Sequence, residues 1–251
     1  MPVVTSEAVV LRTWPVHEAD LIVSFFTRDH GKVRGVAKAA LKSRKRFGGA
    51  LEPMTLARAW FVERPRQELT RLDQLEIIRS PLSAPVDQAR LTVLSFFAEV
   101  LEEALPEHDP QETVFRLLVS VLEQTSAVTS ETQPWMPLTY FSLWMTRLLG
   151  LLPDIAHCTV CGEALRAGEV TFNAHADGLF CSVHRNGSAN VLSADSWQLA
   201  LRMLRAPVSA FAADPWPRRR GQDLRRFTLA VLERHLERKL RSAEALARLG
   251  A

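Results

Sequence analysis

Four residues in the second half of the chain have the types and spacing of a metal site. Cys158 and Cys161 form a CxxC pair, and a CxxH pair, Cys181 and His184, follows after nineteen intervening residues. Two ligands separated by two residues can point at one ion from a tight turn, and four such ligands complete a tetrahedral zinc shell. We therefore predict one structural Zn²⁺ bound by these four side chains.

The fourth ligand is the open part of this prediction. His157 and His175 lie close by in the sequence, and His184 is preferred because its spacing repeats that of the CxxC pair. The alternative is three buried thiols beside a surface histidine. Two pairs at matching spacing make that alternative the weaker interpretation.

A shell closed by four protein ligands leaves no position for a water or a substrate, so this metal is not expected to catalyse a reaction. The sequence contains no GxxxxGK[ST] phosphate-binding motif, and no HxE precedes the cysteines, as a zinc nucleobase deaminase requires. We find no convincing pair of nucleophile and base. We predict a binding protein rather than an enzyme, with a hydrolase that uses an open zinc site as one alternative.

A second feature with chemical meaning is a concentrated run of cations near the N-terminus. Between residues 28 and 46 there are eight Lys or Arg and one acid, whereas the whole chain carries a net charge of only +3. Such a run predicts a polyanion-binding surface, with a solvated charged face as the alternative. The predicted DNA-binding residues are Arg28, Lys32, Arg34, Lys38, Lys42, Arg44, Lys45 and Arg46.

The strand expected at residues 32–38 would arrange part of this run. Alternate side chains of a strand share a face, so Lys32, Arg34 and Lys38 are expected to stand outward together. Neighbours on that face lie about 6.6 Å apart, which suits successive phosphates of an extended strand.

Two further groups of residues are weaker candidates for DNA contact. Trp14 and Phe47 lie at predicted loop edges, where an aromatic ring could stack on a base. A basic cluster beside the last long helix is a possible second DNA site, or only a solvated face. It consists of Arg218, Arg219, Arg220, Arg225 and Arg226.

The elements that must position these residues change character along the chain. Residues 1–80 contain five β-rich runs with turns between them, which predict a small barrel or sandwich. Residues 81–251 show apolar residues at helical spacing, interrupted at 155–190 by short strands and turns around the cysteines. We predict an α+β multidomain protein with an N-terminal barrel, a helical domain and an inserted zinc-ribbon-like module.

Bulk composition agrees with a folded protein. The 251 residues are 47% hydrophobic and 24% charged, which excludes a disordered chain. The most apolar long window, residues 134–153, contains Pro137 and Arg147, so a buried helix is expected there rather than a membrane span. An odd cysteine count argues against a disulfide framework, and the N-terminus lacks a signal sequence. We expect a cytoplasmic protein.

The N-terminal stretch also resembles a known family. The segment VVLRTWPVHEADLIVSFFTRDHGKVRGVAKAALKSRKRFGGALEP is similar to the N-terminal domain of RecO, a family of bacterial recombination mediators. The shared features are the acid after the first loop, the TRxHG turn, the basic third strand and the closing RFGGALxP. The resemblance continues to the cysteine module. His184 departs from the family pattern, which more often has cysteine there, and both residues ligate zinc.

The resemblance implies an OB-fold, a helical domain that carries a zinc module, and a role in recombinational DNA repair. It implies binding to single- and double-stranded DNA, annealing of complementary strands, binding to RecR and the single-strand-binding protein, and help in loading RecA at the nucleoid. An OB-fold binds oligonucleotides on its strand 2–3 face and its loops 1–2 and 4–5. These correspond here to residues 21–38, 14–20 and 63–68.

Two expectations complete the sequence-based account. The acidic, apolar-ended C-terminal tail of the single-strand-binding protein needs a cation beside an apolar groove, and Arg116 and Arg147 are the candidates in the acidic helical middle. The alternative function is a zinc-ribbon RNA-binding or transcription accessory protein, which a basic barrel and a zinc site would also permit.

Overall fold

The chain folds into two compact units in a computed structural model, which describes residues 2–62, 68–83, 87–127, 134–166, 170–173, 175, 177–185 and 190–249. The first unit is Met1–Leu122 and the second is Glu123–Ala251. The first unit therefore contains the strand-rich segment, the helix Gln88–Ala104 and most of the helix Glu112–Ser126.

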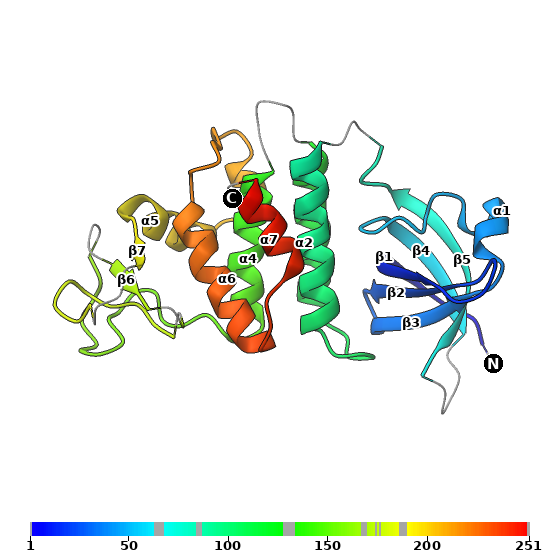
Figure 1. Cartoon of the computed structure of the whole chain (residues 1–251), viewed down its shortest axis with the longest axis horizontal. Coiled ribbons are helices and arrows are strands. Elements are labelled where there is room, and N and C mark those ends of the chain that lie inside the picture. Colours follow the sequence, from blue (N-terminus) through cyan, green and yellow to red (C-terminus); the bar gives the residue numbers. More distant parts are fainter. Residues whose placement is uncertain are drawn as a thin grey trace. The chain divides into compact units, whose positions relative to one another are not determined.

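A closed five-stranded barrel forms the larger part of the first unit (Figure 1). The strand order is β1-β2-β3-β5-β4, with β3 and β5 parallel and the other neighbours antiparallel. The predicted barrel is confirmed, and its architecture is OB-like. The strands are β1 (Val4–Pro15), β2 (Leu21–Thr27), β3 (Gly31–Ala37), β4 (Leu56–Val62) and β5 (Thr70–Arg79).

The inside of the barrel is filled by alternate apolar residues of all five strands. Phe25 and Phe61 meet there edge to face, with ring centroids 5.4 Å apart. Glycine at position 31 is required by two constraints. Its φ is +69°, and a Cβ atom would lie 2.3 Å from the carbonyl oxygen of Asp109, in the loop after the first long helix.

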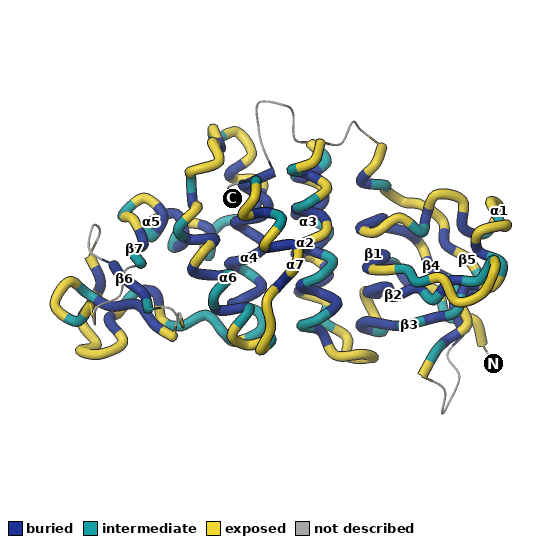
Figure 2. The backbone as a smooth tube through the Cα atoms, in the orientation of Figure 1, coloured by how far each residue is buried: buried dark blue, intermediate teal, exposed yellow. Residues whose placement is uncertain are grey.

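The segment between β3 and β4, which the sequence suggested was a loop, is partly helical. A short 3-10 helix, η1 (Ala40–Lys42), is followed by one helical turn, α1 (Arg44–Phe47). Ala40 and Phe47 are buried and belong to the barrel core. The segment is therefore anchored at both ends, and the residues between these anchors are the ones that face solvent (Figure 2).

Two helices, α2 (Gln88–Ala104) and α3 (Glu112–Ser126), follow the barrel. They pack on the outer face of β2 and β3, where Phe26 meets Phe115 with ring centroids 5.6 Å apart. Next to this contact the Glu102 carboxylate accepts hydrogen bonds from Ser24 Oγ at 2.5 Å and from Arg34 Nη2 at 3.0 Å.

The same contact contains a buried lysine. Lys32 Nζ donates to the backbone carbonyl of Glu102, and the Lys32 carbonyl accepts from the backbone N–H of His108 at 2.9 Å. Arg34 also pairs with Glu107, with 3.1 Å between Nε and Oε1. We call Ser24, Lys32, Arg34, Glu102 and Glu107 the Glu102 network. It joins the end of α2 to the barrel.

The second unit is mainly helical. Its described elements are α4 (Trp135–Leu148), β6 (Val170–Phe172), β7 (Asn190–Leu192), α5 (Ala194–Met203), η2 (Val208–Phe211), α6 (Gln222–Leu236) and α7 (Arg241–Arg248). Most of α4 is buried, as expected for a core helix. None of the helices in the described part of the chain is both long and apolar enough to span a membrane.

The end of the chain departs from expectation. The pattern of residues 222–240, QDLRRFTLAVLERHLERKL, is typical of one helix, but α6 stops where Glu237 takes a left-handed conformation with φ 52°. Glu233 then accepts a hydrogen bond from the Leu240 backbone N–H at 3.0 Å, and α7 begins.

The Glu102 network leads to a stability prediction. Replacing Glu102, which is 8% exposed, with alanine removes the charge that lies beside buried Lys32 and pairs with the partly exposed Arg34. Loss of one partner of a buried ionic contact costs on the order of 3 kcal/mol. Glu107→Ala is the matched control, because that acid is exposed and pairs with the same arginine, and its loss should cost below about 1 kcal/mol. Urea unfolding followed by circular dichroism measures both, and equal losses would contradict this account of the network.

Candidate nucleic-acid interface and metal centre

The strand face predicted to carry three outward cations is only partly open. Lys32 is 4% exposed, so the prediction that it stands outward is wrong. The pKa of its ammonium group is lowered, because the effect of burial under α2 is larger than the opposing effect of the Glu102 charge. The strand alternation was predicted correctly. However, the sequence places α2 in the predicted helical domain, residues 81–251. Nothing in the sequence indicates that Glu102 of α2 lies over β3.

Three other cations of the basic run also have partners. Arg34 is held by Glu102 and Glu107, and Arg28 Nη2 lies 2.7 Å from a carboxylate oxygen of Glu7. Arg46 donates to the Lys38 carbonyl at 2.5 Å and to Ser43 Oγ at 3.1 Å, and its guanidinium lies 5.0 Å from the centre of the Phe47 ring. Arg46 therefore braces the segment between β3 and β4.

The remaining four cations of the run form a different group. Within the described residues, their side chains are exposed and make no hydrogen bond or ion pair, so their charges are available to a ligand. All four lie on the short segment that Ala40, Arg46 and Phe47 hold against the barrel. We call Lys38, Lys42, Arg44 and Lys45 the open cations.

Beside the open cations, the half of the strand face that α2 leaves uncovered carries an aromatic ring. The strand register places Trp14, Ile22 and Val36 in one row across β1, β2 and β3, and all three are partly exposed. The guanidinium carbons of Arg12 and Arg34 lie 5.1 Å and 5.9 Å from the centre of the Trp14 ring. Trp14 therefore remains a candidate for base stacking, in a cationic setting.

Arg12 is not among the residues predicted from the sequence, because it lies outside the dense run of cations at residues 28–46. The signal that could have found it is the two-residue spacing of Arg12 and Trp14 on one strand, because such residues share a face. Phe47, the other proposed stacking residue, is 1% exposed and lies in the barrel core. That prediction is wrong, because α1 turns the ring inward.

The second basic cluster, beside α6, also contains both buried and exposed arginines. Arg225 is 6% exposed and donates to the carbonyls of Arg218 and Arg220, at 2.5 Å and 2.8 Å, and to Thr139 Oγ1 at 2.9 Å. Burial lowers its pKa to about 10, so it stays charged at neutral pH. It holds the loop before α6 in place, and the expectation that it faces DNA is wrong.

Other members of this cluster lie at the surface or pair locally. Arg220 lies 4.4 Å from the centre of the Trp216 ring and pairs with Asp214 at 2.8 Å. Arg218, Arg219 and Arg226 are exposed.

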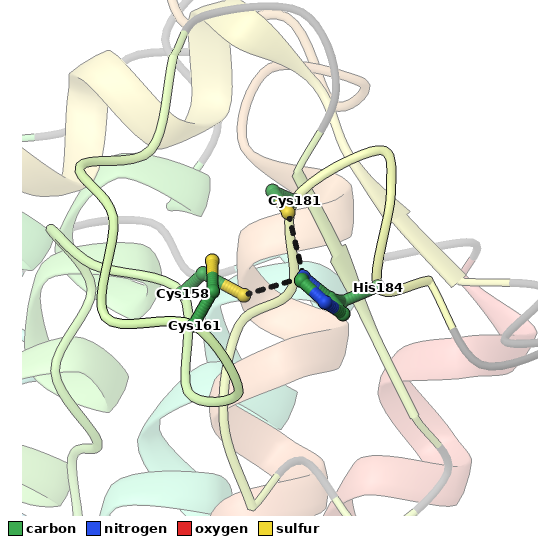
Figure 3. A group of neighbouring side chains, drawn as sticks. All are labelled: Cys158, Cys161, Cys181 and His184. Carbon is green, nitrogen blue, oxygen red and sulfur yellow. Dashed lines mark hydrogen bonds between the residues drawn. The ribbon is translucent and has the colours of Figure 1, made fainter.

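The predicted metal ligands come together in the second unit (Figure 3). One ligand atom from each of Cys158, Cys161, Cys181 and His184 lies within 4.8 Å of all the others. His184 Nδ1 faces the sulfur atoms, at 3.3 Å from Cys181 Sγ and 4.0 Å from Cys158 Sγ. Four side chains placed in this way can hold one metal ion.

Two tight turns bring the pairs into position. The first is closed by a hydrogen bond from the Gly162 N–H to the Cys158 carbonyl at 2.8 Å, and the second by one from the His184 N–H to the Cys181 carbonyl at 3.1 Å. Between these two turns in the sequence, Thr171 and Phe180 are joined by a pair of backbone hydrogen bonds.

The donor set fits zinc. Burial would raise the pKa of the Cys158 thiol, but hydrogen bonds from the backbone N–H groups of Cys161, Cys181 and Val160 lower it to about 6. A thiolate is the form that binds zinc, and three sulfurs with one imidazole are a common structural set. Among the described residues His157 and His175 are not in this group, and His157 Nδ1 instead contacts Asp154 at 2.8 Å.

Two predicted features are not brought into either site. Most of the loop at 63–68 lies outside the described residues. Arg116 and Arg147 are both exposed and belong to different units, Arg116 to the first and Arg147 to the second. Arg147 lies over the Trp144 ring, 5.7 Å from its centre.

Comparison with known proteins places both units in one family. Residues 1–81 match the family described as Recombination protein O N terminal, and residues 86–244 match Recombination protein O C terminal. DNA repair protein RecO of Koribacter versatilis is 51% identical over 97% of this chain and 98% of its own length. DNA repair protein RecO of an Anaeromyxobacter species is 34% identical over 96% and 95%. The chain belongs to the RecO family of DNA repair proteins.

Proposed function

We propose that this protein binds single- and double-stranded DNA, anneals complementary strands and helps to load RecA onto DNA coated by the single-strand-binding protein. The observation that carries the proposal is the set of four open cations, Lys38, Lys42, Arg44 and Lys45, on a braced segment of an OB-like barrel. Such a protein works with RecR and the single-strand-binding protein, in the cytoplasm at the nucleoid. We propose that it acts as a binding protein rather than as an enzyme.

The chemistry of the surface favours a nucleic-acid backbone over a compact anion. Four cations that have no partner among the described residues can neutralise several phosphates, which gives affinity without sequence preference. The Trp14 ring offers a flat surface to a base, and Arg12 adds a positive charge next to it. The exposed arginines 218, 219 and 226 of the second unit are a possible second contact for DNA.

We propose that Cys158, Cys161, Cys181 and His184 hold one structural Zn²⁺. The ion would fix the two turns of residues 158–184 around a common centre and contribute folding free energy directly. With four protein ligands it leaves no coordination position for a substrate, so DNA binding does not pass through the metal.

We also propose that the acidic tail of the single-strand-binding protein contacts Arg116 or Arg147. Arg147 is the better supported of the two, because its guanidinium lies over Trp144 on a helix that is mostly buried. Arg147→Ala should weaken binding of a tail peptide about tenfold in fluorescence anisotropy, and Arg116→Ala tests the other residue in parallel. Unchanged affinity in the double variant would remove this proposal.

The DNA-binding proposal is tested by the salt dependence of binding. Each phosphate contact with a single strand contributes about −0.7 to the slope of log K against log salt, so four contacts predict a slope of about −3. Lys42→Gln with Lys45→Gln should make the slope shallower by about 1.4. Reversing all four open cations to glutamate should abolish binding and annealing while the protein stays folded, because exposed unpaired cations contribute little to stability.

A matched control removes two exposed cations from the second unit, Arg205→Gln with Arg248→Gln, and should leave the slope unchanged. Normal DNA binding by the fourfold reversal variant would contradict the proposed surface. Preference for structured RNA over single-stranded DNA in a competition assay would instead support the RNA-binding alternative.

The zinc proposal is tested by metal content. Cys158→Ala and Cys181→Ala should each lose the ion and expose residues 155–190 to limited proteolysis, because the site would lack one of its four ligands. His184→Cys should keep one zinc per chain, and His175→Ala is the control that should not release it. Zinc loss from His175→Ala would overturn the ligand choice. Complete loss of annealing by a folded, zinc-free variant would overturn the structural role.

A further inference from the structure

An exposed leucine lies among the open cations. Leu41 is 62% exposed, the largest exposure among the large hydrophobic side chains of the described first unit. Its neighbours Lys42, Arg44 and Lys45 are all exposed as well. Exposed leucines are common on protein surfaces, so the exposure alone carries no conclusion.

The backbone around Leu41 holds it in a fixed position. Ala39 takes a left-handed conformation with φ 51°, and its N–H donates to Asp20 Oδ1 at 2.7 Å. The Leu41 N–H donates to the carbonyl of Ala19 at 3.2 Å, and Ala40 is buried in the barrel core. The turn is therefore tied to the loop between β1 and β2, and it presents Leu41 outward on a rigid support.

The tie between the two loops also brings a second apolar side chain to this end of the barrel. Val16, 44% exposed, lies on the loop that Leu41 bonds to, two residues after Trp14. An apolar side chain next to cations that have no partner among the described residues suits a ligand that is anionic outside and apolar inside. Single-stranded nucleic acid has this character, because its phosphates carry charge and its unpaired bases have apolar faces.

We infer that Leu41 is a base-contacting wedge, which inserts against or between unpaired bases while Lys38, Lys42, Arg44 and Lys45 hold the phosphates. Apolar wedges of this kind partly unstack neighbouring bases in other nucleic-acid-binding proteins. The inference rests on the proposed DNA binding and adds a preference to it. Leu41 favours unpaired bases, whereas the cations bind any backbone.

The wedge and the cations affect different measurable quantities. Leu41→Ser removes apolar contact without removing charge, so affinity for a single strand should fall about fivefold to tenfold while the salt slope stays the same. Affinity for a duplex of the same sequence should change less than twofold. The probe is a single-stranded oligonucleotide that carries 2-aminopurine, whose fluorescence rises when it unstacks. At saturation the Leu41→Ser complex should show a smaller rise than the wild type.

Leu91→Ser is the matched control, because Leu91 is 47% exposed in the same unit and lies on α2, outside the cation segment. It should bind and fluoresce like the wild type. Wild-type affinity and fluorescence in Leu41→Ser would overturn the wedge while the salt-dependent binding, and with it the proposed function, still stood. Absence of salt-dependent binding by the wild-type protein would overturn both.

Discussion

The buried carboxylate of Glu102 is the constraint on which the first unit depends. A charge at 8% exposure must be neutralised, and here Ser24 and Arg34 donate to it while Lys32 lies beside it and donates to the same residue's carbonyl. Because these donors come from β2 and β3 and the acceptor from α2, satisfying the charge fixes the helix on the barrel. The part of the outer face of β2 and β3 that carries Ser24, Lys32 and Arg34 is then covered by α2.

That covering decides which cations of the basic run are free. Residues Lys32 and Arg34 neutralise the acids of α2 and its following loop, and Arg46 braces the segment after β3. The open cations remain, and so does Trp14, whose ring lies close to the guanidinium groups of Arg12 and Arg34. The run is thus divided: Lys32 and Arg34 on the strand hold the helix to the barrel, and the open cations on the following segment are the ones we propose for DNA binding. In the second unit Arg225 and Arg226 show the same division, one buried among carbonyls and the next exposed.

The sequence predicted what depends on local pattern and spacing. The β-rich runs predicted the barrel strands, and the matching CxxC and CxxH spacing predicted the four side chains that come together around one point. It could not predict what depends on contacts between distant segments. The burial of Lys32 requires Glu102, seventy residues later, and the inward turn of Phe47 requires the barrel core. A run of like charges shows how many cations there are but not which of them have partners.

The central claim is that DNA uses the open half of this surface and leaves the half covered by α2 undisturbed. Hydrogen exchange of the wild-type protein, with and without a single-stranded oligothymidine, tests it directly and needs no substitution. We expect added protection at residues 12–22 and 38–47, and unchanged exchange at residues 26–34 and 100–108. Protection confined to the second unit, or a change in exchange at residues 26–34 and 100–108, would contradict the account.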